Sequence, residues 1–322
     1  MTVHEDYSLS KVLWYRIGGT ARYFLEARNR QDIEEAVKFV KERNIKNVFV
    51  CGSGSNLIFS DDYFDGAVIM IARTVGTPDI SVTDTTLTSF AGQTLDDVIT
   101  QAFDHNLVGL EWAGGLPGTV GAAVRGNVGA FGGEIKDTLY QADVFDTNKQ
   151  DFPLKTLSNP ELEFVYRGSL IKKTKGLIVT CATFQLERAN DAEVLRVAKE
   201  TYLRNKDYRA EHHPLEYPNC GSVFKNIKDP EDVQKVLAVW PDIKEKVQNN
   251  WYGKVAMGYI ISRLGLSGYR IGDAEVSHKH ANFIVNLGHA KAADVRQIIS
   301  EIQNRAQTTL GILPEVEVEI VG

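Results

Sequence analysis

Apolar residues recur along the chain with two different spacings. Between residues 31 and 45 they return every three to four positions, which predicts an amphipathic helix, and the β-branched run at 47–51 predicts a strand after it. A second apolar run at 67–72 predicts another strand, and the Gly/Ser/Asn stretch between the two runs predicts a loop. We therefore expect a small α/β lobe over residues 1–76.

The next segment predicts a second lobe over residues 77–208. After Thr94, apolar residues recur at helical spacing, and Asp97 stands at the third helical position as in a capping box. The other predicted elements are strands at 141–145 and 176–184 and a helix from 191 to about 206.

The remainder predicts a third unit over residues 209–322. The charged, Pro-containing stretch at 204–218 is typical of a linker. Beyond it the pattern predicts helices at about 256–264 and 292–310 and strands at 280–286 and 315–321. The whole chain therefore has the pattern of an α+β protein.

Charge and composition exclude several classes of protein. The chain has 36 Lys and Arg against 42 Asp and Glu, so it lacks the basic surface typical of proteins that bind nucleic acid or anionic membranes. The 3 cysteines form no CxxC pair, and His212, His213, His278 and His280 match no zinc motif, so we expect no metal. Without a signal segment or an apolar run of about 18 residues, the sequence predicts a cytoplasmic protein.

Two glycine-containing loops are candidates for binding a phosphate-bearing ligand. The loop at 52–56 leaves backbone N–H groups able to converge on a phosphate, although it could be a plain turn. Nine of the 27 glycines fall within 109–133, a density that we expect a packed helix or strand not to tolerate. There the stretch at 116–121 could approach a flat ring, or form a tight crossing of loops. Together they suggest a dinucleotide held between adjacent lobes.

Seven sequence strings, in order and spread over nearly the whole chain, resemble the UDP-N-acetylenolpyruvoylglucosamine reductases. The strings are YRIGGTARYF (15–24), GSGSNLIFSD (52–61), GLPGTVGAAVRGNVGAFGGEI (115–135), FVYRGS (164–169), CGSVFKN (220–226), EVSHKHANFIVN (275–286) and LPEVEVEIVG (313–322). The resemblance implies a two-lobed FAD-binding unit of the vanillyl-alcohol-oxidase type and a C-terminal α+β substrate domain, whose last strand carries Glu315 back to the active site.

The resemblance also implies the reaction and the cofactor. NADPH would reduce a UDP-N-acetylglucosamine enolpyruvyl ether to UDP-N-acetylmuramate in peptidoglycan precursor synthesis, through non-covalent FAD. By motif match, the FAD-binding residues are Gly52, Ser53, Gly54, Ser55, Asn56, Leu57, Pro117, Gly118, Thr119, Gly121, Asn127 and Gly129. We expect a monomer. The alternatives are another FAD-linked oxidoreductase on the same scaffold and a catalytically silent protein that binds a UDP-sugar or flavin.

Three residues match the catalytic positions of the family. Arg167 would hold the substrate carboxylate, although a surface arginine is the commoner case. Glu315 would be kept partly protonated by burial and by the neighbouring substrate carboxylate, and would donate a hydrogen bond to the developing negative charge. The alternative is a solvated strand face, because Glu315, Glu317 and Glu319 alternate along the chain. Ser222 would donate the proton, although a serine in a turn is usually a hydrogen-bonding cap.

Other matched positions concern the substrate and departures from the family pattern. The expected substrate-binding residues are Tyr166, Lys225, Asn226, His280, Lys206 and Arg209. Ser277 and Asn282 belong to the same polar set, for which structural hydrogen bonding is the alternative. Ala122, Arg125 and Tyr15 differ from the usual pattern beside the expected flavin, and the chain resembles the subgroup that lacks the substrate-closing tyrosine loop.

Overall fold

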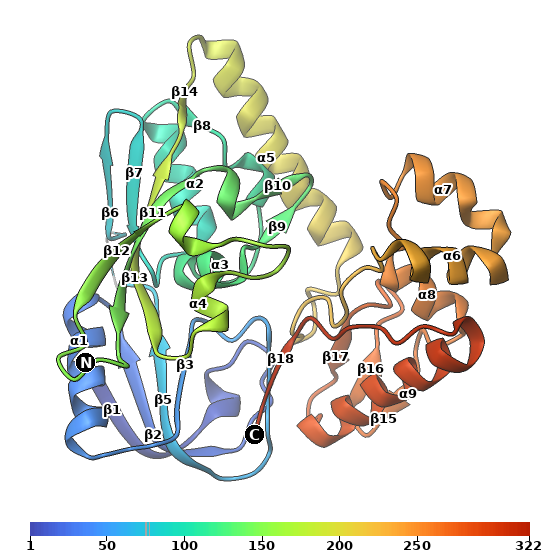
Figure 1. Ribbon diagram of the computed structural model, residues 1–322, viewed down its shortest axis with the longest axis horizontal. Coiled ribbons are helices and arrows are strands. Elements are labelled where there is room, and N and C mark those ends of the chain that lie inside the picture. Colours follow the sequence, from blue (N-terminus) through green and yellow to red (C-terminus); the bar gives the residue numbers. More distant parts are fainter. Residues whose placement is uncertain (75, 77) are drawn as a thin grey trace. The chain divides into compact units, whose positions relative to one another are not determined.

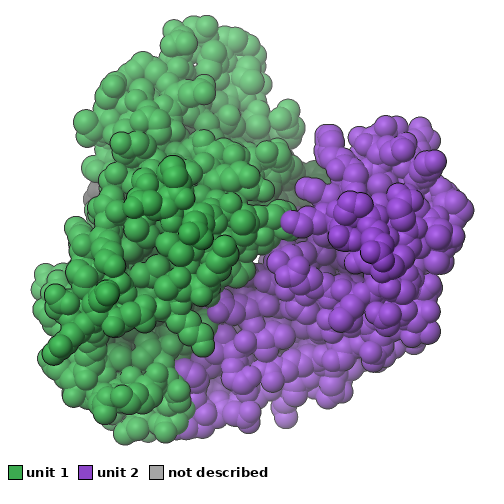
Figure 2. Space-filling model, viewed as in Figure 1, with its two compact units in different colours: residues 1–7, 21–53, 65–211 green, residues 8–20, 54–64, 212–322 purple. Residues whose placement is uncertain are grey.

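The computed structural model describes residues 1–74, 76 and 78–322 (Figure 1). The chain forms two compact units (Figure 2). Unit 1 comprises Met1–Tyr7, Ala21–Ser53 and Asp65–Glu211, and unit 2 comprises Ser8–Thr20, Gly54–Phe64 and His212–Gly322. The lobe boundary expected between 76 and 77 involves residue 77, which lies outside the described residues. The three-domain division stays a prediction.

Two sheets form the framework of unit 1 among the described residues. The first has the order β1-β2-β5-β3 and contains β1 (Thr2–Ser8), β2 (Thr20–Ala27), β5 (Phe64–Ile71) and β3 (Val48–Cys51), with β3 and β5 parallel. The second is antiparallel with the order β12-β11-β13-β7-β6, from β12 (Leu154–Ser158), β11 (Leu139–Asp146), β13 (Leu177–Gln185), β7 (Thr86–Phe90) and β6 (Ile80–Thr83). Short pairs join β8 (Leu107–Val108) to β14 (Glu187–Arg188) and β9 (Gly129–Ala130) to β10 (Gly133–Glu134).

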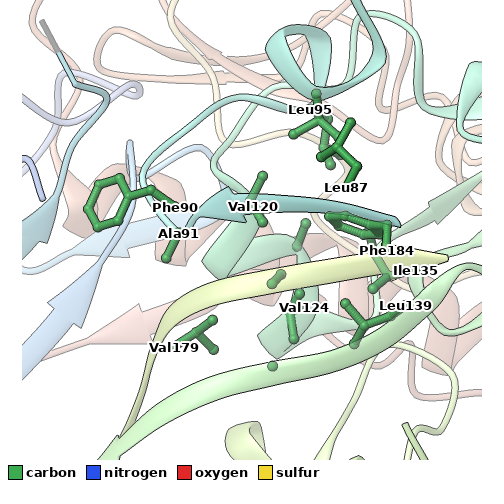
Figure 3. Close-up of a cluster of buried hydrophobic side chains, with 14 of the residues drawn as sticks. Leu87, Phe90, Ala91, Leu95, Val120, Val124, Ile135, Leu139, Val179 and Phe184 are labelled. Atoms are coloured by element: carbon green, nitrogen blue, oxygen red, sulfur yellow. The ribbon is translucent and has the colours of Figure 1, made fainter. Parts of the chain in front are cut away.

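Helices pack against the second sheet or, in the case of the last one, against another helix and a loop. They are α1 (Arg30–Glu42), α2 (Leu95–Asp104), α3 (Val120–Gly126), α4 (Leu170–Lys173) and α5 (Ala192–His212). Leu87 and Phe184 from neighbouring strands share a hydrophobic cluster with Leu95 of α2 and Val124 of α3 (Figure 3). The predicted helices at 31–45 and after Thr94, and the strands between 47 and 184, are confirmed.

The glycine density of residues 109–133 predicted that this stretch would contain no packed helix. This prediction is wrong, because α3 forms inside the stretch. Gly121 lies in this helix, and a Cβ there would come within 2.8 Å of the Ala91 Cβ. The missing side chain therefore permits close packing of the helix on the turn that follows β7.

The stretch at 204–218 is also not a linker along its whole length. Helix α5 continues to His212, and Asn205 and Arg209 are buried on its inner face. The stretch contains good helix formers, and its first proline is Pro214, so the helix can continue to His212. The high density of charged residues made this helix look like a linker in the sequence.

Unit 2 combines distant segments of the chain around its own core. Its strands are β4 (Leu57–Phe59), β15 (Arg270–Ile271), β16 (Ala274–Val276), β17 (Ile284–Asn286) and β18 (Glu319–Val321). Its helices are α6 (Pro230–Val239), α7 (Lys244–Asn249), α8 (Met257–Arg263) and α9 (Ala292–Leu310). β18 pairs in parallel with β4. The predicted strand over 315–321 is thus shorter, and Glu315 precedes it.

Candidate functional site

The two predicted glycine loops meet inside unit 1. Gly52 follows β3 and lies against Thr119, so a Cβ on Gly52 would approach the Thr119 Oγ1 to 2.2 Å. Beside it, the Ser53 hydroxyl is buried and has no hydrogen-bond partner among the described residues. An unpaired buried hydroxyl beside bare backbone fits a phosphate oxygen. The remaining residues of the first loop, from Gly54 onward, belong to unit 2.

The second loop is partly used by the protein itself. The Val120 and Gly121 N–H groups donate to the carbonyls of Gln93 and Ala91 at 2.8 Å each. Gly118 has a φ of +118°, a conformation that side chains disfavour, so the turn before α3 depends on glycine. The N–H groups expected to meet a ring are therefore not all free, because two of them anchor α3.

Asn127 joins the loop after α3 to the turn that carries Arg167. Its φ is +43°, and its side-chain amide donates to Glu134 Oε2 at 2.9 Å and to the Val165 carbonyl at 3.0 Å. Its Oδ1 accepts from the Lys136 N–H at 3.1 Å. The fully buried Asn127 side chain thus binds protein on both sides. The role of Glu134 in this network had no signal in the sequence.

Arg167 stands at the corner of a tight turn. Val165 and Gly168 exchange backbone hydrogen bonds at 3.0 and 3.1 Å, and Arg167 adopts a φ of +58° between them. Its Nη2 donates to the Gly129 carbonyl at 2.8 Å, and the guanidinium lies 5.0 Å from the Tyr166 ring centroid. The arginine is half-buried and oriented, which distinguishes it from a freely solvated surface arginine.

Lys206 and Arg209 lie on the inner face of α5, beside Gly115. The Lys206 ammonium contacts Asp96 at 3.2 Å and the Tyr202 hydroxyl at 3.1 Å, and the latter bond contributes most to raising the pKa of Lys206. Arg209 Nε donates to the Gly114 carbonyl at 3.0 Å, while its Nη2 has no partner among the described residues. Burial lowers the pKa of Arg209 to about 10, so it stays cationic at neutral pH.

Within unit 2, Ser222 precedes a short extended segment that contacts the C-terminal stretch. The Lys225 N–H donates to the Glu315 carbonyl at 2.9 Å, and the Lys225 ammonium pairs with the Glu315 carboxylate. The Glu315 side chain is 70% exposed, so the expectation that the protein buries this carboxyl group is wrong. The reason is that β18 begins only at Glu319 and leaves Glu315 on an open segment.

The polar set expected to bind a sugar divides into two kinds. Asn282 and Ser277 are buried and bonded to backbone, whereas Asn226 is exposed and its Oδ1 accepts from the Met257 N–H at 3.1 Å. His280 is half-buried against Phe283, with ring centroids 4.9 Å apart, and burial lowers its pKa. Among the described residues no group of three or more His, Cys, Asp or Glu is arranged to hold a metal ion.

The three departures from the family pattern occupy different environments. Tyr15 is completely buried in the unit 2 core, where its hydroxyl donates to the Ile284 carbonyl at 2.9 Å, so its side chain is shielded from any ligand. Ala122 is exposed on α3, and the Arg125 carbonyl accepts from the Ser169 hydroxyl at 2.7 Å.

Cys220, beside Tyr15, has a pKa raised to about 12 by burial, so its thiol stays protonated.

Comparison with known proteins assigns the chain to a family. A family model for the C-terminal domain of UDP-N-acetylenolpyruvoylglucosamine reductase matches residues 213–321, and a model described as an FAD binding domain matches residues 21–149. A reductase of this name from Caldicellulosiruptor saccharolyticus is 37% identical over 99% of this chain and 91% of its own length. One from Anoxybacillus flavithermus is 33% identical over 100% of this chain and 95% of its own.

A solved structure agrees with these sequence matches. The structure matches that of the UDP-N-acetylenolpyruvylglucosamine reductase from Thermus caldophilus with a TM-score of 0.74 and 28% sequence identity. The match covers 100% of each chain. The α+β fold with an FAD-binding part and a C-terminal reductase domain is therefore confirmed, as is FAD as the cofactor. Among the described residues no helix is long and apolar enough to cross a membrane. The chain belongs to the UDP-N-acetylenolpyruvoylglucosamine reductase family.

Proposed function

We propose that Arg167, Ser222 and Glu315 carry out the reduction of UDP-N-acetylglucosamine enolpyruvate to UDP-N-acetylmuramate, with NADPH as the reductant. The full-length similarity to reductases of this name carries the proposal. The ion pair of Lys225 with Glu315 supports it, because Lys225 follows Ser222 closely in the chain and proton transfer needs such a group of donors and acceptors.

Residues of both glycine loops fit the cofactor. The bare backbone at Gly52 and the unpaired Ser53 hydroxyl suit a phosphate of FAD, and the positive φ of Gly118, which glycine adopts readily, lets the second loop approach closely. FAD, when bound, carries the hydride between the nicotinamide and the substrate. Neither loop, at 52–57 or 116–121, contains a histidine or cysteine, so we propose non-covalent binding.

Arg167 is proposed to bind the carboxylate of the enolpyruvyl group. Addition of hydride to the terminal alkene carbon leaves an electron pair on the adjacent carbon and on its carboxylate. A guanidinium stabilises this charge through paired N–H donors. The Arg167 Nη2 bond to the Gly129 carbonyl and the contact with Tyr166 orient the group before substrate arrives, which supports the role.

Ser222 is proposed to give its hydroxyl proton to the electron-rich carbon. Lys225 would resupply that proton from solvent, and the positive charge of its ammonium would stabilise the serine alkoxide meanwhile. Glu315, whose carboxylate contacts the Lys225 ammonium, is proposed to take up a proton from solvent and to donate a hydrogen bond to the substrate carboxylate. The diphosphate is proposed to meet Lys206 and Arg209, and the sugar or uridine Tyr166, Asn226 and His280.

Stopped-flow measurement of the two half-reactions tests the role of Ser222. We expect Ser222→Ala to leave the reduction of bound FAD by NADPH unchanged and to slow flavin reoxidation by the UDP-sugar about 100- to 10,000-fold. Ser222→Cys keeps a proton and should recover part of the rate. Ser300→Ala, on the exposed face of α9, is the matched control. Equal slowing of both half-reactions, or of neither, would remove Ser222 from proton transfer.

The state of the protein in solution is a separate part of the proposal. We propose a cytoplasmic monomer that needs no nucleic acid or membrane partner. Light scattering of the purified holoenzyme should give a mass close to the 35.8 kDa chain plus its cofactor, and a multiple of that mass would contradict the monomer.

A further inference from the structure

The segment that follows Ser222 is hydrogen-bonded on one side by the C-terminal stretch. The Lys225 N–H donates to the Glu315 carbonyl at 2.9 Å, and the Glu317 N–H donates to the Val223 carbonyl at 2.8 Å. Phe224 and Val316 form an antiparallel bridge between these two bonds. Residues 223–225 therefore resemble a strand that has one regular neighbour.

On its other side the segment is held by one residue, Asn282. The Phe224 N–H donates to Asn282 Oδ1 at 3.0 Å, and Asn282 Nδ2 donates to the Phe224 carbonyl at 2.9 Å. The Val223 N–H donates to the Asn282 main-chain carbonyl at 2.8 Å. A primary amide carries the same donor and acceptor as a peptide group, so this side chain replaces one residue of a missing strand.

Asn282 is itself fixed by the loop between β16 and β17. The Ser277 hydroxyl accepts from the Lys279 and His280 N–H groups, and the Ser277 N–H donates to the Phe283 carbonyl at 2.9 Å. The Asn282 N–H donates to the His280 ring Nδ1 at 3.3 Å. The Asn282 side chain is 3% exposed, which argues against contact with a sugar.

We propose that Asn282 is a positioning residue, which fixes the backbone after Ser222 and thereby aims the Ser222 hydroxyl and the Lys225 ammonium. The proposal rests on the proposed proton-donor role of Ser222. A proton donor works only within hydrogen-bond reach of the receiving atom, and a displacement of about 1 Å can cost on the order of 100-fold in rate.

The first test compares Asn282→Ala with Asn286→Ala. Asn286 is similarly buried, and its amide bonds to the Tyr15 carbonyl and the Gly288 and Ala290 N–H groups, none of which belongs to residues 222–225. We expect both variants to melt at a lower temperature. Asn282→Ala alone should speed amide hydrogen exchange in residues 223–225 and slow flavin reoxidation by the UDP-sugar at least 10-fold, with FAD reduction by NADPH unchanged.

A double variant separates the positioning role of Asn282 from the proton-donor role of Ser222. If Asn282 acts through Ser222, adding Asn282→Ala to Ser222→Ala should slow reoxidation no further. An Asn282→Ala single variant that reoxidises at the parent rate, while Ser222→Ala is slow, would overturn the positioning role. If Ser222→Ala itself is harmless, the proton-donor role fails and the catalytic part of this inference fails with it. Hydrogen exchange then reports separately whether Asn282 holds the segment.

Asn282→Asp provides a readout that a loss of stability would not produce. A carboxylate accepts from the Phe224 N–H but donates to the Phe224 carbonyl only when protonated. Reoxidation by Asn282→Asp should therefore slow as the pH rises through the pKa of the new carboxyl, relative to the parent. His280, His213, Lys225 and Glu315 lie nearby in both proteins, so their titration cancels in the comparison. A pH profile identical to the parent would contradict the proposal.

Discussion

At the scale of single residues, the motif positions were predictable but their surroundings were not. Arg167 and Ser222 are predicted as site residues because their strings match a family, and their roles stay predictions. That Asn127 binds Glu134, or that Asn282 replaces a strand residue, depends on contacts with residues far away in the sequence or in another loop. An asparagine that holds backbone and one that binds a sugar look the same in a sequence, because both use the same amide donor and acceptor.

Glu315 is predicted from its motif, but its surroundings differ from those expected. Its carboxylate pairs with Lys225 on an exposed segment. If it acts as a hydrogen-bond donor to the substrate carboxylate, Glu315→Gln keeps a donor and should slow flavin reoxidation about 10-fold. Glu315→Ala and Glu315→Asp should slow it about 100- to 1,000-fold, in line with the loss of one oxyanion donor.

The control for this series is Glu301→Gln, which removes an exposed ion pair with Arg305 on α9 and should have no effect on either half-reaction. Equal losses for Gln, Ala and Asp at position 315 would contradict the role of Glu315 as a hydrogen-bond donor.

At the scale of elements, local signals were reliable and dense glycine or charge was misleading. The capping box of α2 is present as predicted, with Thr94 and Asp97 bonded reciprocally. Helix α6 was not predicted, although Asp229 caps it and Pro230 opens it. Helix α3 was missed for a different reason. Its Gly121 is required by close contact with Ala91, and a requirement of tertiary packing leaves no local pattern in the sequence.

The start of α2 should contribute stability that depends on pH. Burial alone would raise the pKa of Asp97, but hydrogen bonds from Arg73 and Thr94 outweigh it, so the folded pKa lies below the ordinary value of 3.8. The ionised carboxylate therefore stabilises the fold above about pH 4, and this contribution is lost as the pH falls through the folded pKa. Asp97→Asn should lower the urea midpoint most near pH 7 and progressively less below pH 4. A penalty independent of pH would contradict the carboxylate's role.

At the scale of the whole molecule, the interleaving of the chain was beyond sequence reasoning. Residues 8–20 and 54–64 belong to the unit built mainly from 212–322, and Tyr15, Ile17 and Ile58 lie in its core. Strand β18 pairs with β4 across some 260 positions in sequence, from the register Glu319 to Leu57. Such pairing leaves no local pattern, because its partners are specified only when the chain folds.

Asp61 offers a direct test of this interleaving. Its carboxylate oxygens accept from the N–H groups of Ala292 and Ala293, at 3.0 and 3.1 Å, and so cap helix α9 from a loop more than 200 residues earlier. Lys291, the residue before the helix, has no side-chain acceptor for this purpose. Asp61→Ala should therefore destabilise unit 2 by about 1 kcal/mol, the usual value of a helix cap with charge at the N-terminus.

The expected effect of Asp61→Ala on amide hydrogen exchange is confined to one part of the molecule. Amide hydrogen exchange in Asp61→Ala should rise in the first turns of α9, while the exchange of α2 in unit 1 stays at the parent level. Asp65→Ala, at an exposed ion pair with Arg22, is the matched control and should leave α9 unchanged. Faster exchange confined to the loop around residue 61, with α9 unaffected, would mean that the distant carboxylate does not stabilise the helix. Raised exchange at α9 would show that a segment early in the chain helps to hold the C-terminal domain that carries Ser222 and Glu315.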